Sequence, residues 1–159
     1  MERMSRAFTK EDETGDGLGG IGERPVSAHR NLVTPGGLAA MDAELARLRE
    51  ELAEAGGERE RVAHLSRDLR YWTARRETAE LSVPDPGSDV VRFGMSVRVA
   101  AEDGRENTWR IVGEDEADAG QGTISHVSPM ARALFGKGVG EEAVVNGVWW
   151  EILWVRGDG

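Results

Sequence analysis

Hydrophobic residues recur at alternating steps of three and four along residues 38–79, which is the spacing of the inward-facing positions of a coiled coil. The first seam comprises Leu38, Met41, Leu45, Leu48, Leu52 and Ala55; the second comprises Val62, Leu65, Leu69, Trp72 and Ala79, with Arg76 as a polar member. Gly56-Gly57 separates the seams, and Thr34 followed by Pro35 is typical of a helix start. The pattern predicts an antiparallel two-helix coiled coil over residues 34–83, with its tip near residues 54–60.

The period changes to two beyond Pro84 and Pro86, which lie in a predicted linker over residues 84–89. Segments rich in β-branched and aromatic residues then alternate with glycines, and Ser128-Pro129 marks the start of one short helix. We therefore predict an α+β fold, in which residues 90–156 form a small, mostly antiparallel sheet packed on that helix. Much of the core is expected to come from Trp109, Trp149, Trp150 and Trp154.

Residues 1–33 are rich in glycine and poor in large apolar side chains. Such a segment buries too little apolar surface to offset the entropy lost on ordering. We predict a flexible tail here, with Phe8, Ile21 and Leu32 as the side chains able to dock on the rest of the chain.

The charge balance narrows the function classes. The 159 residues hold 29 Asp and Glu against 20 Lys and Arg, a formal net charge of -9, and no cysteine. This excludes a basic surface over the whole chain that would bind nucleic acid directly, as well as disulfides and zinc–thiolate sites. No apolar run approaches the roughly 20 residues that span a bilayer, and the N-terminus lacks a signal peptide's apolar region. We expect a cytoplasmic protein with no membrane partner.

One string in the predicted sheet domain is more specific than these patterns. It reads Ile124-Ser125, then Ser128-Pro129-Met130-Ala131-Arg132-Ala133-Leu134, then Gly136-Lys137 and Gly140; Phe93-Gly94, Arg110-Ile111-Val112-Gly113 and Asp115-Glu116 precede it. Together these residues resemble the C-terminal domain of the GreA/GreB transcript-cleavage factors. Val33-Thr34 and Arg70-Tyr71 resemble the coiled coil of GreB, so the resemblance covers residues 33–145.

The resemblance implies a bacterial transcription elongation factor whose C-terminal domain is FKBP-like. In that family this domain docks on RNA polymerase at the rim of the secondary channel, which assigns polymerase binding to Ser128, Pro129, Met130, Ala131 and Arg132. A Ser-Pro helix start would also hold their exposed neighbours rigidly, so we expect these residues to serve both the helix and the docking surface. The coiled coil enters the channel, and acidic residues at its tip hold a magnesium ion for RNA cleavage by the polymerase's own active site. The resemblance thus implies an accessory factor rather than an enzyme, a monomer that meets nucleic acid only through the elongation complex. It implies no stably bound cofactor, and any Mg²⁺ would be shared with RNA polymerase.

The expected tip differs from the family pattern. The acidic cleavage motif of GreA and GreB is absent, and residues 55–61 read Ala-Gly-Gly-Glu-Arg-Glu-Arg. The hairpin is also about 20 residues shorter than in those factors, which removes roughly 15 Å of reach at 1.5 Å per residue over two helices. This truncation resembles Rnk. The main hypothesis is a channel-binding regulator of elongation, and the alternative is an Rnk-like competitor that occupies the channel without stimulating cleavage.

Two interpretations of the tip stay open. Glu54, Glu58 and Glu60 could form a substitute metal-presenting tip, because carboxylates are the ligands that Mg²⁺ prefers. Alternatively, they belong to a solvated face interleaved with arginines, where oppositely charged neighbours form ordinary pairs along the helices. Two other functions are also considered: prolyl isomerisation, from fold analogy alone, and a self-associating coiled coil.

The remaining polar groups offer weaker candidates. His29, His64 and His126 are isolated in the sequence and lack metal-ligand spacing. His126 lies at a predicted strand end, where we expect a structural or surface residue. The acidic segment at residues 114–118 could hold a cation, but a role in the fold is the better expectation.

Overall fold

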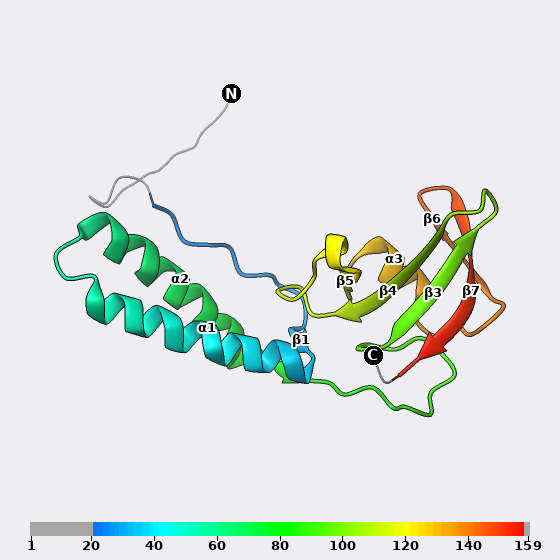
Figure 1. The fold of residues 1–159 in the computed structure, drawn as a ribbon, viewed down its shortest axis with the longest axis horizontal. Coiled ribbons are helices and arrows are strands. Elements are labelled where there is room, and N and C mark those ends of the chain that lie inside the picture. Colours follow the sequence, from blue (N-terminus) through cyan, green and yellow to red (C-terminus); the bar gives the residue numbers. More distant parts are fainter. Residues whose placement is uncertain (1–20, 158–159) are drawn as a thin grey trace, which may run out of the picture. The chain divides into compact units, whose positions relative to one another are not determined.

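The computed structural model describes residues 21–157, which divide into two compact units (Figure 1). The hairpin unit comprises residues 21–28 together with residues 39–78. The sheet unit comprises residues 29–38 and 79–157. In the described part of the chain, no helix is long and apolar enough to cross a membrane.

The hairpin is built from α1 (Pro35–Glu54) and α2 (Arg59–Thr78), each 20 residues long. A helix of that length spans about 30 Å. Gly56, with φ +56°, adopts the left-handed conformation that reverses the chain between the helices. The facing side chains are Leu48, Leu52, Ala55, Val62, Leu65, Leu69 and Trp72. Both predicted seams therefore meet, as the heptad spacing required.

The polar position of the second seam is Arg75, not the predicted Arg76. Arg75 is 1% exposed, whereas the guanidinium of Arg76 lies near the surface, 2.7 Å from Asp42. Steps of three and four both continue the seam after Trp72, and the helix follows the step of three. Ala79, predicted as a seam position, lies beyond the end of α2.

The larger sheet contains β3 (Ser96–Ala101), β4 (Glu106–Val112), β5 (Thr123–Ser125), β6 (Glu142–Val145) and β7 (Val148–Arg156). Their order is β5-β4-β3-β7-β6, and the pairs are antiparallel except β4 with β5. A 3-10 turn, η2 (Ala119–Gln121), precedes β5, and α3 (Pro129–Leu134) packs against β5 and β6. The α+β class with one short helix is thereby confirmed. The predicted linker, residues 84–89, contains no helix or strand.

Only part of the predicted tryptophan core is correct. Trp150 is buried with Val97, Val99, Ile111 and Ile152, and Trp109 packs against this core, but Trp149 is 58% exposed. Successive strand residues point to opposite faces, so Trp149 and Trp150 cannot both point inward. Trp154 is displaced by a β-bulge: Val99 pairs with Ile152 while Arg98 pairs with Trp154, which leaves one extra residue in β7 and turns Trp154 onto the face of Arg98.

The predicted flexible tail differs from the structure over residues 21–33. β1 (Leu32–Val33) pairs in parallel with β2 (Glu80–Leu81), and Leu32 packs against the sheet core. Residues 21–24 lie against α2 within the hairpin unit. The segment is anchored by strand pairing, by polar contacts with α2 and by the burial of Leu32 and Val33. Phe8 and the rest of residues 1–20 lie outside the described residues.

Candidate functional site

The start of α3 is capped as the sequence predicted. Ser128 has an extended backbone, and its Oγ accepts a hydrogen bond from the backbone N–H of Ala131 at 3.3 Å. Pro129 occupies the first helical position, where its missing N–H costs nothing. The Arg132 N–H donates to the Ser128 carbonyl at 3.0 Å. These bonds fix the first turn and the residues that it presents.

The five residues assigned to polymerase binding divide by exposure. Pro129 and Arg132 are exposed, Ser128 and Met130 are half-buried, and Ala131 is fully buried in the sheet core. Ala131 therefore serves packing, since a partner protein cannot contact a side chain with no accessible surface. The surface available to a partner is Ser128, Pro129, Met130 and Arg132.

The three predicted tip carboxylates are exposed and lie on different segments. Glu54 is the last residue of α1, Glu58 precedes α2, and Glu60 is in its first turn. Glu58 lies 3.7 Å from Arg61, whose guanidinium is also 3.6 Å from Glu51. In residues 21–157 no three His, Asp or Glu side chains are grouped as a metal site would require.

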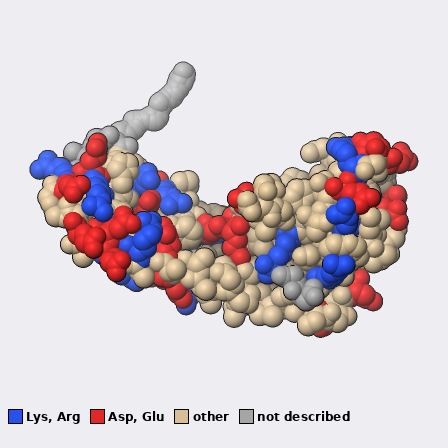
Figure 2. All heavy atoms as spheres, in the orientation of Figure 1, with Lys and Arg blue, Asp and Glu red and all other residues tan. Residues whose placement is uncertain are grey.

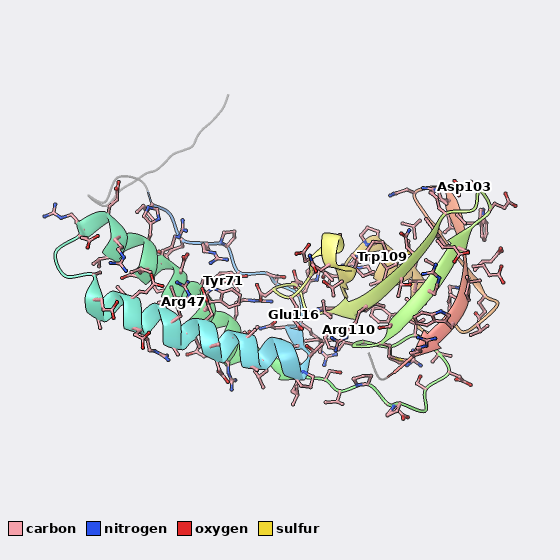
Figure 3. The ribbon with its side chains drawn as sticks, in the orientation of Figure 1. Arg47, Tyr71, Asp103, Trp109, Arg110 and Glu116 are labelled. Carbon is pink, nitrogen blue, oxygen red and sulfur yellow. The ribbon has the colours of Figure 1, made fainter. Side chains whose placement is uncertain are left out.

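Further along α1, the same interleaving of charges continues. Arg47 pairs with Glu44 at 2.6 Å and with Glu51 one turn later (Figure 3). The hydrogen bond from Arg47 lowers the pKa of Glu44 below its ordinary value. This arrangement agrees with the interpretation of the charged positions as a solvated, paired helix face.

Glu116 lies in the acidic segment for which the sequence indicates a role in the fold, but the sequence does not identify its partners. Its carboxylate accepts hydrogen bonds from the backbone N–H groups of Thr34 at 3.0 Å and Gly113 at 3.1 Å, and from the Thr34 hydroxyl (Figure 3). Thr34 in turn caps α1, because its Oγ1 accepts from the Gly37 N–H at 3.0 Å. The acidic loop therefore has the fold role expected for it. No local signal identifies this contact, which joins residues 82 apart in the chain.

The His126 side chain is enclosed within the sheet unit. It is buried and lies edge-to-face on Phe93, with ring centroids 5.6 Å apart. Desolvation lowers the pKa of its imidazole below the ordinary value, which favours the neutral form. A neutral, enclosed imidazole fits the structural role predicted for it.

A second group of contacts joins the N-terminal segment to α2. The Arg24 guanidinium lies 3.9 Å from the centre of the Tyr71 ring and 3.3 Å from Asp68. Glu23 accepts two hydrogen bonds from Arg70, at 2.8 and 2.6 Å, and hydrogen bonding to this guanidinium lowers the pKa of Glu23. Sequence reasoning missed these residues because their partners are more than 40 positions away.

Comparison with known proteins decides the family. The family model described as "Transcription elongation factor, GreA/GreB, C-term" matches residues 85–155. Transcription elongation factor GreB of Neisseria meningitidis serogroup B is 35% identical over 139 residues, covering 74% of this chain and 85% of that protein. Transcription elongation factor GreA of Ruegeria pomeroyi is 34% identical over 135 residues, covering 72% and 86%. The chain belongs to the GreA/GreB family.

Solved structures also align with this GreA/GreB family member, at lower sequence identity. GreA factor homolog 1 (Gfh1) of Thermus thermophilus aligns at 19% identity over 81% of this chain and 100% of that one, with a TM-score of 0.40. A GreA/GreB factor from Nitrosomonas europaea aligns at 23% identity over 79% and 98%, with a TM-score of 0.37.

The alignments with GreA/GreB relatives also carry information on length. The alignment with the Neisseria GreB is 139 positions long and includes 74% of the 159 residues of this chain, which is about 118 residues. About 21 alignment positions therefore have no counterpart in this chain. The alignment with the Ruegeria GreA is 135 positions long and includes 72% of this chain, so about 20 positions have no counterpart here. The two numbers of unmatched positions are similar in size to the shortfall of about 20 residues expected for the hairpin, and the alignment lengths do not place them along the chain. Ser128–Arg132 lies inside the matched C-terminal region, and the hairpin tip lies outside it.

Proposed function

We propose that this GreA/GreB family member binds bacterial RNA polymerase at the secondary channel and regulates elongation there without stimulating RNA cleavage. The observation that carries the proposal is a hairpin of two 20-residue helices in a chain whose C-terminal region matches the family model. The protein would act as a cytoplasmic monomer and compete with cleavage-stimulating Gre factors.

The docking half of the proposal rests on the start of α3. Its capped first turn holds Pro129 and Arg132 exposed, while the buried Ala131 and Leu134 fix the helix to the sheet. A rigid, partly apolar surface with one guanidinium needs little ordering on binding, and this limits the entropic cost of docking. This supports the family's use of the segment as a polymerase contact.

The non-cleaving half rests on reach. A deficit of about 20 residues, shared by two helices at 1.5 Å per residue, shortens the hairpin by roughly 15 Å. Magnesium binds oxygen at about 2 Å, so a carboxylate displaced by several ångströms makes no contribution to coordination. In addition, Glu58 already pairs with Arg61. The competing proposal, in which Glu54, Glu58 and Glu60 help RNA polymerase to hold Mg²⁺, requires the tip to reach the active site in spite of this.

The deciding experiment uses a stalled, backtracked elongation complex. The protein is added alone and then together with an authentic GreA, and the length of the RNA is followed. We expect no shortening of the RNA with the protein alone and a suppression of GreA-stimulated cleavage. Shortened RNA that is lost in the Glu54→Gln, Glu58→Gln, Glu60→Gln triple variant would establish the cleaving alternative instead.

Two variants test the docking surface in the same assay. Arg132→Ala should weaken the suppression of GreA about tenfold, the effect of losing one charge-assisted contact at an interface. Arg105→Ala is the matched control, because this exposed arginine belongs to the turn between β3 and β4 rather than to α3. Equal suppression by both variants would remove the α3 surface from the proposal.

A further inference from the structure

The solvent-facing side of the sheet carries two large apolar residues at its β6–β7 end. Trp149 is 58% exposed and Val144 is 45% exposed, and the two are directly paired across the strands. Tryptophan at this exposure leaves a large apolar surface in water, and exposed apolar surface rimmed by polar groups is typical of an interaction site. Since β6 is an edge strand, another chain can approach this corner.

Next to this apolar pair lies a row of acidic side chains. Glu142 is paired with Glu151 across β6 and β7, and Ala100 of β3 pairs with Glu151 on its other side. Like charges directly opposite each other destabilise a sheet. Elsewhere on the sheet, Glu106 has a partner, because Arg98 lies 2.7 Å from it. In the described part of the chain we find no such cation for Glu142 or Glu151.

The two features line one pocket of about 350 Å³. Its lining residues are Ala100, Ala101, Glu102, Glu142, Trp149 and Glu151. The alanines leave room where larger side chains would fill the space, the indole forms an aromatic wall, and three carboxylates surround it. An aromatic face attracts a cation and carboxylates accept its hydrogen bonds, so this combination is suited to a planar guanidinium.

The charge of the whole sheet region favours the same ligand. Residues 79–159 carry 14 acidic and 7 basic side chains, whereas residues 39–78 carry 9 and 8. Acidic atoms gather at the end of the sheet where β6 and the β3–β4 turn lie (Figure 2). A basic partner would therefore be attracted to this end of the sheet before contact is made.

The molecule uses the same chemistry internally. Arg24 lies on the ring of Tyr71 at 3.9 Å and pairs with Asp68 at 3.3 Å, so one guanidinium meets an aromatic ring and a carboxylate. Arg156 lies 3.9 Å from the centre of the Trp154 ring on the same strand as Trp149. The pocket at Trp149 offers both kinds of contact to a guanidinium, and no arginine is among the described residues that line it.

We propose that this pocket binds an arginine side chain from a basic segment of a partner protein. The guanidinium lies against Trp149 and is held by Glu142 and Glu151, and Val144 contacts an apolar neighbour in the partner segment. The site is separate from the α3 surface proposed for polymerase binding and does not depend on it.

The test uses the full chain and a fluorescein-labelled peptide of sequence Gly-Val-Arg-Val-Arg-Gly, with binding followed by fluorescence anisotropy. A peptide with glutamine in place of both arginines is the control. We expect the arginine peptide to bind at least about tenfold more tightly than the glutamine peptide, in line with one charge-assisted contact. Because no polymerase is present, failure here is distinguishable from failure of the proposed function.

Four variants locate the site. Trp149→Ala, and Glu142→Gln combined with Glu151→Gln, should each weaken the binding of the arginine peptide about tenfold, whereas Trp149→Phe keeps a ring and should retain most of it. Asp89→Asn is the matched control, as an exposed acid of the same unit that does not line the pocket. Thermal unfolding confirms that each variant folds.

Three results would overturn the proposal. Equal affinity for the two peptides would show that charge plays no part. Equal affinity of all variants would place the peptide elsewhere. Self-association of the chain that is lost in Trp149→Ala, with no binding of the arginine peptide, would identify a second copy of this protein as the occupant.

Discussion

At the scale of single residues, two adjacent glycines at the start of α1 should respond in opposite ways to the same substitution. A Cβ at Gly37 would lie 2.2 Å from the carboxyl carbon of Glu116, whereas one at Gly36 would meet only the Thr34 Oγ1, at 3.9 Å. Gly37→Ala must displace a carboxylate that accepts three hydrogen bonds, so we expect a loss of about 1–3 kcal/mol in the free energy of unfolding. Gly36→Ala should gain about 0.5 kcal/mol from helix propensity.

Urea unfolding of the two variants measures this difference. Combining Gly37→Ala with Glu116→Ala provides the control, because the clash disappears once the carboxylate has been removed. The cost of Gly37→Ala should therefore be largely absent in the Glu116→Ala background. Equal costs in both backgrounds would show that the carboxylate does not hold the start of α1.

Whether the sequence predicts a contact of a single residue depends on how far apart the two partners lie along the chain. The caps at Thr34 and Ser128 are local, since each hydroxyl accepts from an N–H three residues later, and both were predicted. The anchor at Glu116 depends on a residue 82 positions away. Likewise the outward turn of Trp154 follows from a bulge in strand pairing, which a periodic pattern cannot reveal.

At the scale of elements, the segment before β1 acts as a third component of the hairpin. Arg24 is anchored on Tyr71 and Asp68 of α2, with its side chain 35% exposed. Removing a half-buried cation–π contact and its ion pair should cost about 1–2 kcal/mol. We therefore expect Arg24→Ala to speed the hydrogen exchange of α2 amides around Tyr71.

The comparison for this element is Arg30→Ala. Arg30 also pairs with a carboxylate, Glu80, but its side chain is 74% exposed. Exposed pairs contribute little, so this change should leave exchange in α2 unaltered. Similar exchange in both variants would mean that the segment does not stabilise the hairpin.

The helices and the tail show why element prediction succeeded in one case and failed in the other. Heptad spacing predicts which residues of α1 and α2 pack against each other, and these residues form one buried cluster. Residues 21–33 carry no such period, and their order comes from separate contacts with α2 and with β2. Amino-acid composition predicted a flexible tail, because composition contains no information on pairwise contacts between distant residues.

At the scale of the whole molecule, charge is distributed differently from what the acidic tip suggested. Residues 39–78 are nearly balanced, with 9 acidic and 8 basic side chains, and the excess of acid lies in residues 79–159. If the protein enters a basic-lined channel of RNA polymerase as proposed, the long-range attraction must therefore originate mainly outside the helices. The ion pairs of Arg47 and Arg61 with neighbouring glutamates further reduce the field of the hairpin.

This distribution leads to a prediction for association kinetics with RNA polymerase. Raising salt from about 50 to 300 mM shortens the screening length from roughly 14 to 6 Å, so the association rate constant should fall about tenfold while dissociation changes less. The Glu54→Gln, Glu58→Gln, Glu60→Gln triple variant should keep most of that salt dependence, because it leaves the acidic excess of the sheet region in place. Stopped-flow measurement with labelled polymerase separates the two rates. If association of the triple variant no longer responds to salt, the attraction comes from the tip carboxylates. That result would contradict the proposal that the short hairpin keeps these carboxylates away from the polymerase active site.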